Sequence, residues 1–340
     1  MAVLGQGVSI APAIEISVGV GVDAVAAIAS PLSELIATIP GLPATARWPW
    51  ISASVLKPAP HEHPWLLSLA AGSTLVAAAV LLDDLSGSVV RTSLAGTAES
   101  HRGALLARDD YAGCRLGDAL AASLMSGLRE FSIGPVVQSP ALAALVRGLP
   151  VGLVVEDVSV PLVRTGVGLP TGISHGSARS LRKARNRMAA DGLVPEITVS
   201  ADGSEITGSL PLLESISRER DHQGGRMSPL DDPARRRLWQ RRVIALAAEG
   251  RLRMATLRLN GELAAYVLGI EDGRSYRVLE GRYVTRWARY SPGRVLEAAV
   301  LDAATIADSV DELDWMTGVA PETLLAANDV DRLVVVSGRT

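Results

Sequence analysis

The sequence predicts an α/β protein whose mixed sheet is built from two tandem units. Six segments of the first half recur in the same order in the second half, at offsets of 179 to 188 residues. Short apolar runs typical of buried strands alternate with longer segments typical of helices. A chain of 340 residues that is 48% hydrophobic and 20% charged has room for two packed domains and is not generally disordered.

The longest repeated segment runs from Tyr111 to Ala119 and returns from Tyr290 to Ala298. Upstream, residues 69–75 match residues 257–263, and both consist of two apolar runs around a small-residue turn, which predicts a hairpin. Four shorter matches complete the series: 87–91 with 273–277, 130–133 with 312–315, Pro140 with Pro321, and 153–155 with 333–335. We therefore predict units at residues 1–165 and 166–340, joined by a linker near Pro161 to Gly176, where Gly and Pro cluster.

The second unit can be followed element by element. Helices are expected over about 177–190, 210–221, 233–249 and 291–308, with a short one from Pro321. Strands are expected over 194–199, 252–259, 262–270, 275–280, 312–315 and 333–336. The helix near residue 291 has a clear start, because Ser291 suits the N-cap and Pro292 the first helical position. The first unit should repeat this coarse pattern around a mixed sheet with helices on both faces.

The charge pattern limits the possible partners. A net charge of −3 does not fit a chain that binds nucleic acid over its whole surface, although a local basic patch can still do so. Of the 33 basic residues only Lys57 and Lys183 are lysine, so 31 are arginine. The single cysteine, Cys114, excludes an internal disulfide and a zinc site built from cysteines, and it fits a reducing compartment.

We expect a cytoplasmic protein. The first basic residue is Arg47, so the N-terminus lacks the positive region of a secretory signal. Residues 64–82 are uncharged, but Gly72, Ser73 and Thr74 at their centre indicate a turn between two buried strands and not a membrane helix. No metal site is expected, because His61 and His63 flank Glu62 on an extended segment without a third ligand.

Several motifs together resemble the GNAT acyltransferase superfamily. They are the arginine-rich helix at 179–187, the strands from Gly250 and Asn260, the Tyr-Ser-Pro-Gly-Arg turn at 290–294, and the Leu-Asp-Trp-Met-Thr-Gly strand end at 313–318. More narrowly, the motifs resemble the tandem CelD-like or BioF2-like branch, whose architecture is similar to that of the Fem aminoacyl-tRNA-dependent ligases. It covers residues 177 onward directly, and the first half only through the internal repeat.

This resemblance implies transfer of an acyl or aminoacyl group from an activated donor to an amine, with no tightly bound cofactor. In such enzymes the helix after the third central strand offers its N-terminus to donor phosphates. Here that site would comprise Arg289, Ser291, Gly293 and Arg294. A second glycine of the usual loop is replaced by Val295, and Pro292 lacks an N–H, which favours an aminoacyl-tRNA donor over acyl-coenzyme A.

A tRNA donor also needs cationic side chains that contact its phosphates. Two arginine-rich windows without acidic residues, 179–187 and 235–242, are candidates, although arginine on solvated helices can also reflect genome composition. The donor-binding residues predicted from these windows are Arg182, Lys183, Arg235, Arg236 and Arg242.

Four residues are candidates for the chemistry. Glu280, at a strand end where GNAT enzymes often place a base, is the first, although it can equally be a structural partner of Arg282. Tyr290 recurs as Tyr111, which favours a packing role; His222 can act as a base or interact with a helix end; and Asp314 can pair with a cationic substrate. Acceptor-binding residues are expected to be Arg220, Asp221, Arg226, Arg282 and Thr317, with a small-molecule amine as the acceptor.

Overall fold

The computed structural model describes residues 13–340 except 98–100, 150–151, 166–171, 308 and 317–323. The first half contains β1 (Ile14–Val20), α1 (Val22–Ala27), α2 (Ala29–Thr38), α3 (Trp48–Val55), β2 (Glu62–Ala71), β3 (Thr74–Asp84), β4 (Val90–Leu94), β5 (Leu106–Ala107), α4 (Asp110–Leu124), β6 (Arg129–Val136), α5 (Pro140–Gly148) and β7 (Val154–Arg164). The second half contains α6 (His175–Ala190), β8 (Pro195–Ser200), α7 (Gly203–Gln223), α8 (Pro233–Ala248), β9 (Leu252–Leu259), β10 (Glu262–Asp272), β11 (Ser275–Tyr283), the 3₁₀ helix η4 (Thr285–Tyr290), α9 (Pro292–Ile306), β12 (Glu312–Asp314) and β13 (Asp329–Arg339).

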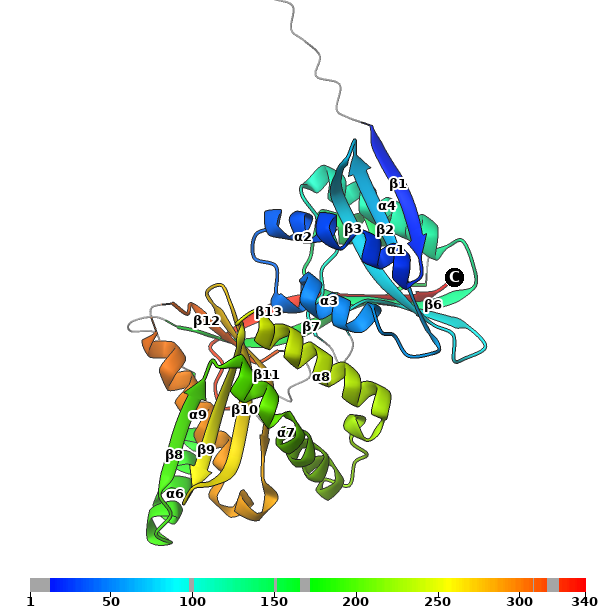
Figure 1. Ribbon diagram of the computed structural model, residues 1–340. Coiled ribbons are helices and arrows are strands. Elements are labelled where there is room, and N and C mark those ends of the chain that lie inside the picture. Colours follow the sequence, from blue (N-terminus) through cyan, green and yellow to red (C-terminus); the bar gives the residue numbers. More distant parts are fainter. Residues whose placement is uncertain (1–12, 98–100, 150–151, 166–171, 308, 317–323) are drawn as a thin grey trace, which may run out of the picture.

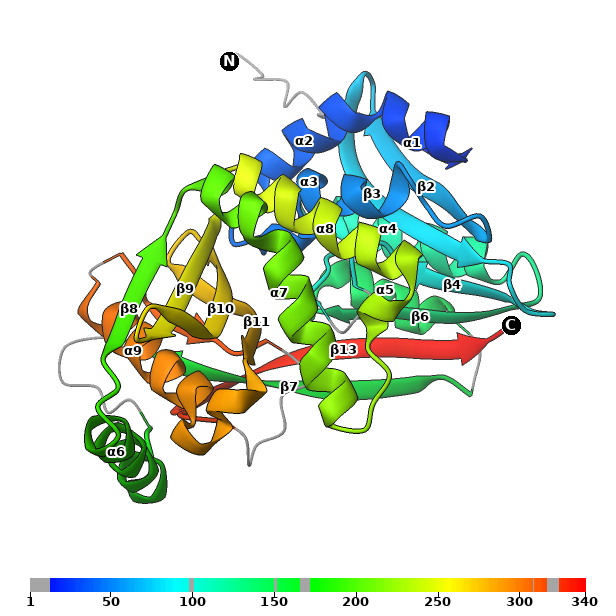
Figure 2. The ribbon, with the colours of Figure 1, turned by 60° about the horizontal axis from the view of Figure 1, so that its bottom comes forward.

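All described strands belong to one sheet, and the two halves exchange their last strands within it. The order is β1-β2-β3-β4-β6-β13-β7-β12-β11-β10-β9-β8, with β5 paired to β3. Strand β13, from the end of the chain, pairs with β6, whereas β7, from the first half, pairs with β12. The antiparallel pair β7–β13 thus joins the two halves, and it crosses the middle of the molecule in Figure 2.

Helices cover both faces of the sheet in each half. In the first half α4 and α5 pack on one face and α1 to α3 on the other; in the second half α6 and α9 oppose α7 and α8 (Figure 1). Helices α3 and α8 pack against each other across the boundary between the halves. The fold is therefore the predicted α/β arrangement of two tandem units on a mixed sheet.

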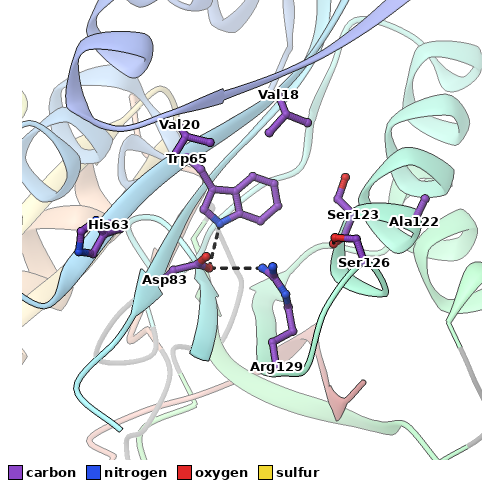
Figure 3. A pocket seen from close by; sticks show the side chains of 9 residues that line it. All are labelled: Val18, Val20, His63, Trp65, Asp83, Ala122, Ser123, Ser126 and Arg129. Atoms are coloured by element: carbon purple, nitrogen blue, oxygen red, sulfur yellow. Dashed lines mark hydrogen bonds and ion pairs between the residues drawn. The ribbon is translucent and has the colours of Figure 1, made fainter. Parts of the chain in front are cut away.

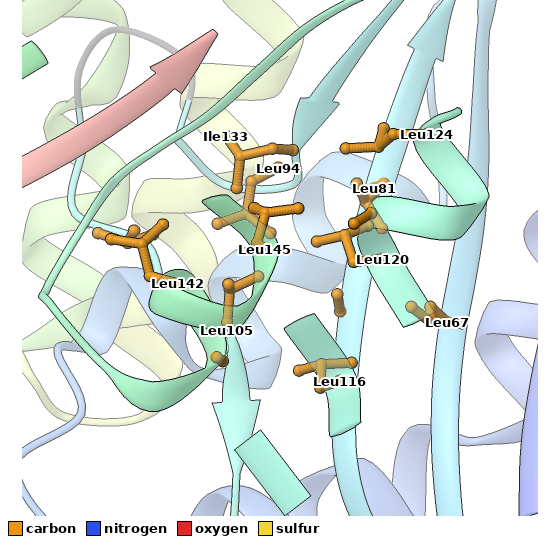
Figure 4. Close-up of a cluster of buried hydrophobic side chains, with 14 of the residues drawn as sticks. Leu67, Leu81, Leu94, Leu105, Leu116, Leu120, Leu124, Ile133, Leu142 and Leu145 are labelled. Carbon is orange, nitrogen blue, oxygen red and sulfur yellow. The ribbon is translucent and has the colours of Figure 1, made fainter. Parts of the chain in front are cut away.

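Leucines dominate the core under α4 and α5 (Figure 4). Leu67 and Leu81 point from β2 and β3 toward Leu116 and Leu120 of α4, and all four are fully buried. Their spacing explains this burial, because alternate strand residues and every third or fourth helix residue face the same layer. Val334 and Val336 of the exchanged strand β13 belong to the same cluster, so the core of the first half includes residues from the end of the chain.

Most predicted elements of the second half are confirmed, although β13 extends beyond the predicted strand 333–336 at both ends and three other differences occur. Helix α7 begins at Gly203, seven residues before the predicted start, because the side chain of Asp202 caps it and the helix continues through Pro211. Residues 161–164, predicted to begin the linker, belong to β7. The short helix expected from Pro321 falls outside the described residues for its first part, up to residue 323, and no helix follows before β13.

The uncharged stretch at residues 64–82 forms most of the β2–β3 hairpin, which turns at Gly72, as predicted. Of the helices that the structure describes, none combines the length and the apolar character needed to cross a membrane.

Candidate functional site

The centre of the second half contains an opening between two parallel strands. Strands β11 and β12 pair over only three residues, Ser275 to Arg277 with Glu312 to Asp314. Beyond this point the chain after β12 follows β7, since Trp315 donates its backbone N–H to Pro161. Strand β11 continues and carries a bulge at Leu279, because Gly269 pairs with Val278 while Leu268 pairs with Glu280. Bulges of this kind leave backbone groups unpaired and redirect side chains.

A pocket of about 190 Å³ adjoins the bulge. Its lining comes from β11 and α8 of the second half and from α3 and the segment at residue 101 of the first half. The lining is partly apolar and aromatic (Trp50, Trp239, Val243, Leu279) and partly ionisable (His101, Arg242, Glu280, Arg282). A small concave site with convergent polar groups is the usual form of a ligand site.

Glu280 is held in this pocket by three hydrogen bonds. Its Oε1 accepts from the hydroxyls of Ser217 (3.0 Å) and Tyr266 (2.8 Å), and its Oε2 accepts from the Trp239 indole (3.0 Å). The Nε of Arg282 lies 3.8 Å from Oε1. The predicted pairing with Arg282 is thus present, but it is one of four contacts. Because a carboxylate oxygen accepts two hydrogen bonds, Oε2 retains one acceptor position for a ligand.

The hydroxyl of Tyr266 fixes the orientation of the Glu280 carboxylate. Burial, followed by the charge of Glu280, raises the pKa of Tyr266 well above its usual value. Tyr266 therefore remains a hydrogen-bond donor to Glu280 across the physiological pH range, which fixes the orientation of the carboxylate.

The first half contributes His101 and Trp50 to the pocket. The His101 ring meets the Trp50 ring edge-on at 5.0 Å between centroids, and the Arg242 guanidinium lies 4.5 Å from the Trp50 ring centre. Arg242 is 3% exposed and donates to Ser54 on α3, so it fastens α8 to the first half. The sequence offered no signal for His101, because nothing local indicates which residues of one half reach the other.

The N-termini of the corresponding helices differ in charge. Helix α4 is capped by the Asp109 carboxylate and has Asp110 in its first turn, both of which disfavour an anion there. Helix α9 begins after Ser291 in a left-handed conformation (φ 51°), with no side-chain cap and no acidic residue in its first turn. Gly293 leaves room beside the Tyr283 ring, which a Cβ would meet at 3.4 Å. Only α9 of this pair has a terminus suited to a phosphate.

Two predicted site residues beside the N-terminus of α9, Arg289 and Tyr290, both bind the side chain of Asp191. The carboxylate of Asp191 accepts from the Tyr290 hydroxyl at 2.7 Å and from Arg289. This hydrogen bond to Asp191 is the main cause of the raised pKa of Tyr290. Tyr290 is 7% exposed and packs in the α9 core, so it lies apart from the residues that line the Glu280 pocket. Its burial corresponds to a packing role.

The two tyrosines that match in sequence, Tyr111 and Tyr290, lie at different positions in the fold. Tyr111 lies in the first turn of α4 and is 61% exposed, whereas Tyr290 precedes α9 and is buried. The helices begin 182 residues apart, at Asp110 and Pro292, so the sequence match at 179 places the two tyrosines at different positions of the fold.

The cluster around His222 is an ion-pair network at the end of α7. His222 Nε2 lies 2.7 Å from Asp231, which also accepts from Arg218 at 2.8 Å. The hydrogen bond from His222, followed by that from Arg218, lowers the pKa of Asp231 to about 2. His222 is not among the residues that line the Glu280 pocket.

The predicted acceptor-binding residues at the end of α7 do not lie together in the structure. Asp221 is buried and pairs with Arg226 at 3.1 Å. Arg220 stacks on the Tyr283 ring at 4.8 Å, which places it on the side of the α9 N-terminus. Arg282 lines the pocket, and Thr317 lies outside the described residues.

Asp314 does not face a substrate. Its side chain is completely buried and pairs with Arg277 and with Arg102, whose Nε lies 3.2 Å away. Arg102 comes from the first half and also contacts Asp331 at 2.8 Å. The expectation that Asp314 binds a cationic substrate is therefore wrong, because two arginines of the chain already neutralise it. No local pattern in the sequence indicates that Arg102 approaches from the other half.

The two arginine-rich windows differ in exposure. On α6 the side chains of Leu181, Ala184 and Met188 face the core. Arg182 and Lys183 lie on the exposed side, where no acidic residue of the described chain pairs with them. On α8, by contrast, Arg235 lies 3.9 Å from Asp232 and Arg236 lies 3.3 Å from Glu214, while Arg242 is buried. The exposed positive charge of Arg182 and Lys183 thus remains available on α6, whereas acidic residues from neighbouring segments neutralise part of the positive charge on α8.

One ionisable residue of interest was not predicted. Glu297 lies in the second turn of α9, where its Oε1 is 4.0 Å from the position of a Cβ on Gly281 of β11. Burial raises its pKa from 4.5 to about 7, an effect that Arg294 only partly offsets. A glutamate in a helical pattern carries no sequence signal of burial, because burial depends on how α9 packs on β11.

A larger cavity lies in the first half, between β1, β2 and α4 (Figure 3). It has a volume of about 420 Å³. Asp83 in its wall already accepts from the Trp65 indole at 2.9 Å and pairs with Arg129 at 3.6 Å, as the dashed lines show. None of the predicted site residues lies there. Across the described ranges, no group of three His, Cys, Asp or Glu side chains is arranged to hold a metal ion.

Comparisons with known proteins agree with this architecture. Residues 176–322 match the family model described as the acetyltransferase (GNAT) domain. No curated protein matches the chain in sequence. The fold is similar to that of FemX, at 9% identity and a TM-score of 0.58 over 91% of this chain and 95% of the other.

A second similar fold is the C-terminal domain (DUF2156) of a putative lysylphosphatidylglycerol synthetase from Agrobacterium fabrum. It shares 10% identity at a TM-score of 0.51, over 92% of each chain. A tandem GNAT protein from the clavulanic acid biosynthesis pathway also matches, with a TM-score of 0.46, 13% identity, and coverage of 96% of this chain and 98% of the other. The second half of this protein is therefore a GNAT acyltransferase domain, at residues 176–322.

Proposed function

We propose that this protein forms amides by transferring an acyl or aminoacyl group from an activated donor to a small amine. The observation that carries the proposal is the pocket at the β11 bulge, where a fixed carboxylate, Glu280, retains one acceptor position beside the opening of the sheet. We assign catalysis to the second unit (166–340) and a supporting role to the first (1–165), which supplies Trp50 and His101 to the pocket wall.

The donor would bind with its phosphate end at the N-terminus of α9, where backbone N–H groups and Arg294 are available and the first turn holds no acidic residue. Its reactive carbonyl would lie in the opening between β11 and β12. Backbone N–H groups freed by the bulge at Leu279 can then stabilise the tetrahedral oxyanion, which is the largest catalytic effect in acyl transfer.

Glu280 is the proton acceptor of this proposal. The amine must be neutral to attack, and its N–H can donate to the open position on Oε2. Glu297 lies against Gly281 on the opposite face of β11, and its pKa of about 7 suits a group that returns a proton to the leaving group.

Aminoacyl-tRNA is the preferred donor, and the exposed basic residues of α6 are the observation that favours it. The α8 window adds less to this preference, because four of its five arginines, Arg235, Arg236, Arg241 and Arg242, contact acidic residues or the first half. Acyl-coenzyme A is the alternative donor, since the family model that matches is that of an acetyltransferase domain. Either donor fits the cytoplasmic location that the sequence predicts.

The test is a product screen by intact mass. The full-length protein is incubated with acetyl-coenzyme A or with a mixture of charged tRNAs, together with a panel of small amines. Formation of an acylated amine with one donor supports the proposal and identifies the donor. Absence of product with either donor would favour a non-catalytic binding module.

Glu280→Gln tests the base in the same screen. General-base catalysis contributes roughly 10²–10⁴-fold, so a loss of at least about 100-fold in kcat is expected. Activity within about threefold of the wild type would remove Glu280 from this role. Glu271→Gln, on β10 and exposed apart from its contact with Arg253, is the matched control.

A further inference from the structure

The Glu280 pocket has features that specify the class of acceptor, and this inference rests on the function proposed above. Its volume of about 190 Å³ equals the share of roughly six water molecules and lies below the usual range for drug-sized ligands. This volume suits a molecule of the size of an amino acid.

The charges of the lining favour a ligand that carries both an amine and a carboxylate. Glu280 offers one acceptor position on Oε2 to an amine. Arg282 projects from the same face of β11, two residues later, and its Nε is buried without a hydrogen-bond partner although it lies 3.8 Å from Glu280. Arginine binds carboxylates through a planar pair of N–H donors. An amine and a carboxylate on one carbon atom match two protein groups that are this close.

The remaining walls favour an apolar side chain. Trp50 and Trp239 supply aromatic surface from two helices in different halves, and Leu279 and Val243 complete an apolar side. A polyamine or an aminoglycoside would place additional cations beside Arg282 and Arg242, at an energetic cost.

We propose that the acceptor is a free α-amino acid with an apolar side chain, bound by its carboxylate to Arg282 and by its amine to Glu280. In the reaction a C–N bond forms between the amine and the donor carbonyl, and the thioester or ester bond of the donor breaks. The proton lost by the neutral amine passes to Glu280, and the thiolate or alkoxide that leaves takes up the proton of Glu297, the proton donor assigned above. The product is an N-acyl or N-aminoacyl amino acid.

Calorimetric titration of the full-length protein separates this inference from the activity. The probes are L-leucine, L-leucinamide, which lacks the carboxylate charge, and 3-methylbutylamine, which lacks the carboxylate. We expect L-leucine to bind roughly 10-fold to 100-fold more tightly than the other two. Equal binding of the three, or no binding of L-leucine, would overturn the inference whether or not any amine is acylated.

Variants of Arg282 identify the group responsible. Arg282→Met should remove the preference for L-leucine over 3-methylbutylamine, and Arg282→Lys, which keeps the charge but not the planar fork, should restore part of it. Arg286→Met, an exposed arginine paired with Glu262 outside the pocket, should leave the preference unchanged. Retention of the full preference in both Arg282 variants would contradict the assignment. Binding that follows this pattern without any acylation would uphold the ligand class and reject the proposed catalysis.

Discussion

Replacing Glu297 by glutamine should stabilise the protein above neutral pH and change little in acid. The pKa of Glu297 is 4.5 when exposed and about 7 in the folded protein, because burial disfavours the charged form. Between these values the folded state holds a proton that the unfolded state has released. Stability is therefore lost as the pH rises from 4.5, and the loss is complete above about 7.

The size of the effect follows from this difference. At about 1.4 kcal/mol per pKa unit, ionisable Glu297 costs about 3 kcal/mol at pH 8 but less than about 1 kcal/mol at pH 5. Glutamine cannot ionise and has nearly the same shape, so the variant recovers this free energy.

Urea unfolding of the wild type and Glu297→Gln at pH 5 and pH 8 measures the effect. The variant should gain about 2–3 kcal/mol relative to the wild type between the two pH values, without a change in the denaturant slope. Asp302→Asn, an exposed substitution on the same helix, is the control and should show no such gain. A difference between variant and wild type that is the same at both pH values would refute the reasoning.

Three further predictions concern other parts of the molecule. Asp314→Asn leaves two buried arginines without their shared carboxylate and should destabilise the protein by about 3–5 kcal/mol in urea unfolding. Asp311→Asn, in an exposed ion pair, is the control and should have no resolvable effect. Equal effects of the two substitutions would contradict the buried network. The double variant Arg182→Gln, Lys183→Gln should lower the salt dependence of tRNA binding by about two contacts in a titration from low to high salt, and an unchanged slope would exclude α6 as the tRNA surface. Tyr290→Phe should keep kcat/KM within about threefold of the wild type, because its hydroxyl is bound to Asp191, and a loss of 100-fold would return it to the catalytic site.

The sequence predicted the local elements well, because their signals are local. Strand β9 has the predicted bounds, and α8 and β10 differ by at most two residues at either end, since apolar periodicity and flanking Gly or Pro mark them. The start of α9 at Pro292 also agrees with the prediction, although the Ser291 side chain makes no capping hydrogen bond.

Side-chain contacts between segments that are far apart in the sequence could not be predicted. The sequence placed Glu280 at the end of a strand, but its donors Ser217, Trp239 and Tyr266 come from three other elements. Asp314 looked open because its partner Arg102 lies 212 residues earlier in the chain. The repeat predicts two units, but it could not show that the last strands of the two halves change places.

Because the last strands are exchanged, the first half cannot complete its fold before the second half has been synthesised. Residues 130–136 of β6 pair with residues 334–339 of β13, so the sheet of the first half is incomplete until the last described strand has been synthesised. Contacts between residues about 200 positions apart close slowly, and during that time β6 presents an unpaired edge that can bind other chains. Removal of β13 would accordingly expose the leucine core under α4, so the loss of a strand from the second half would destabilise the first half.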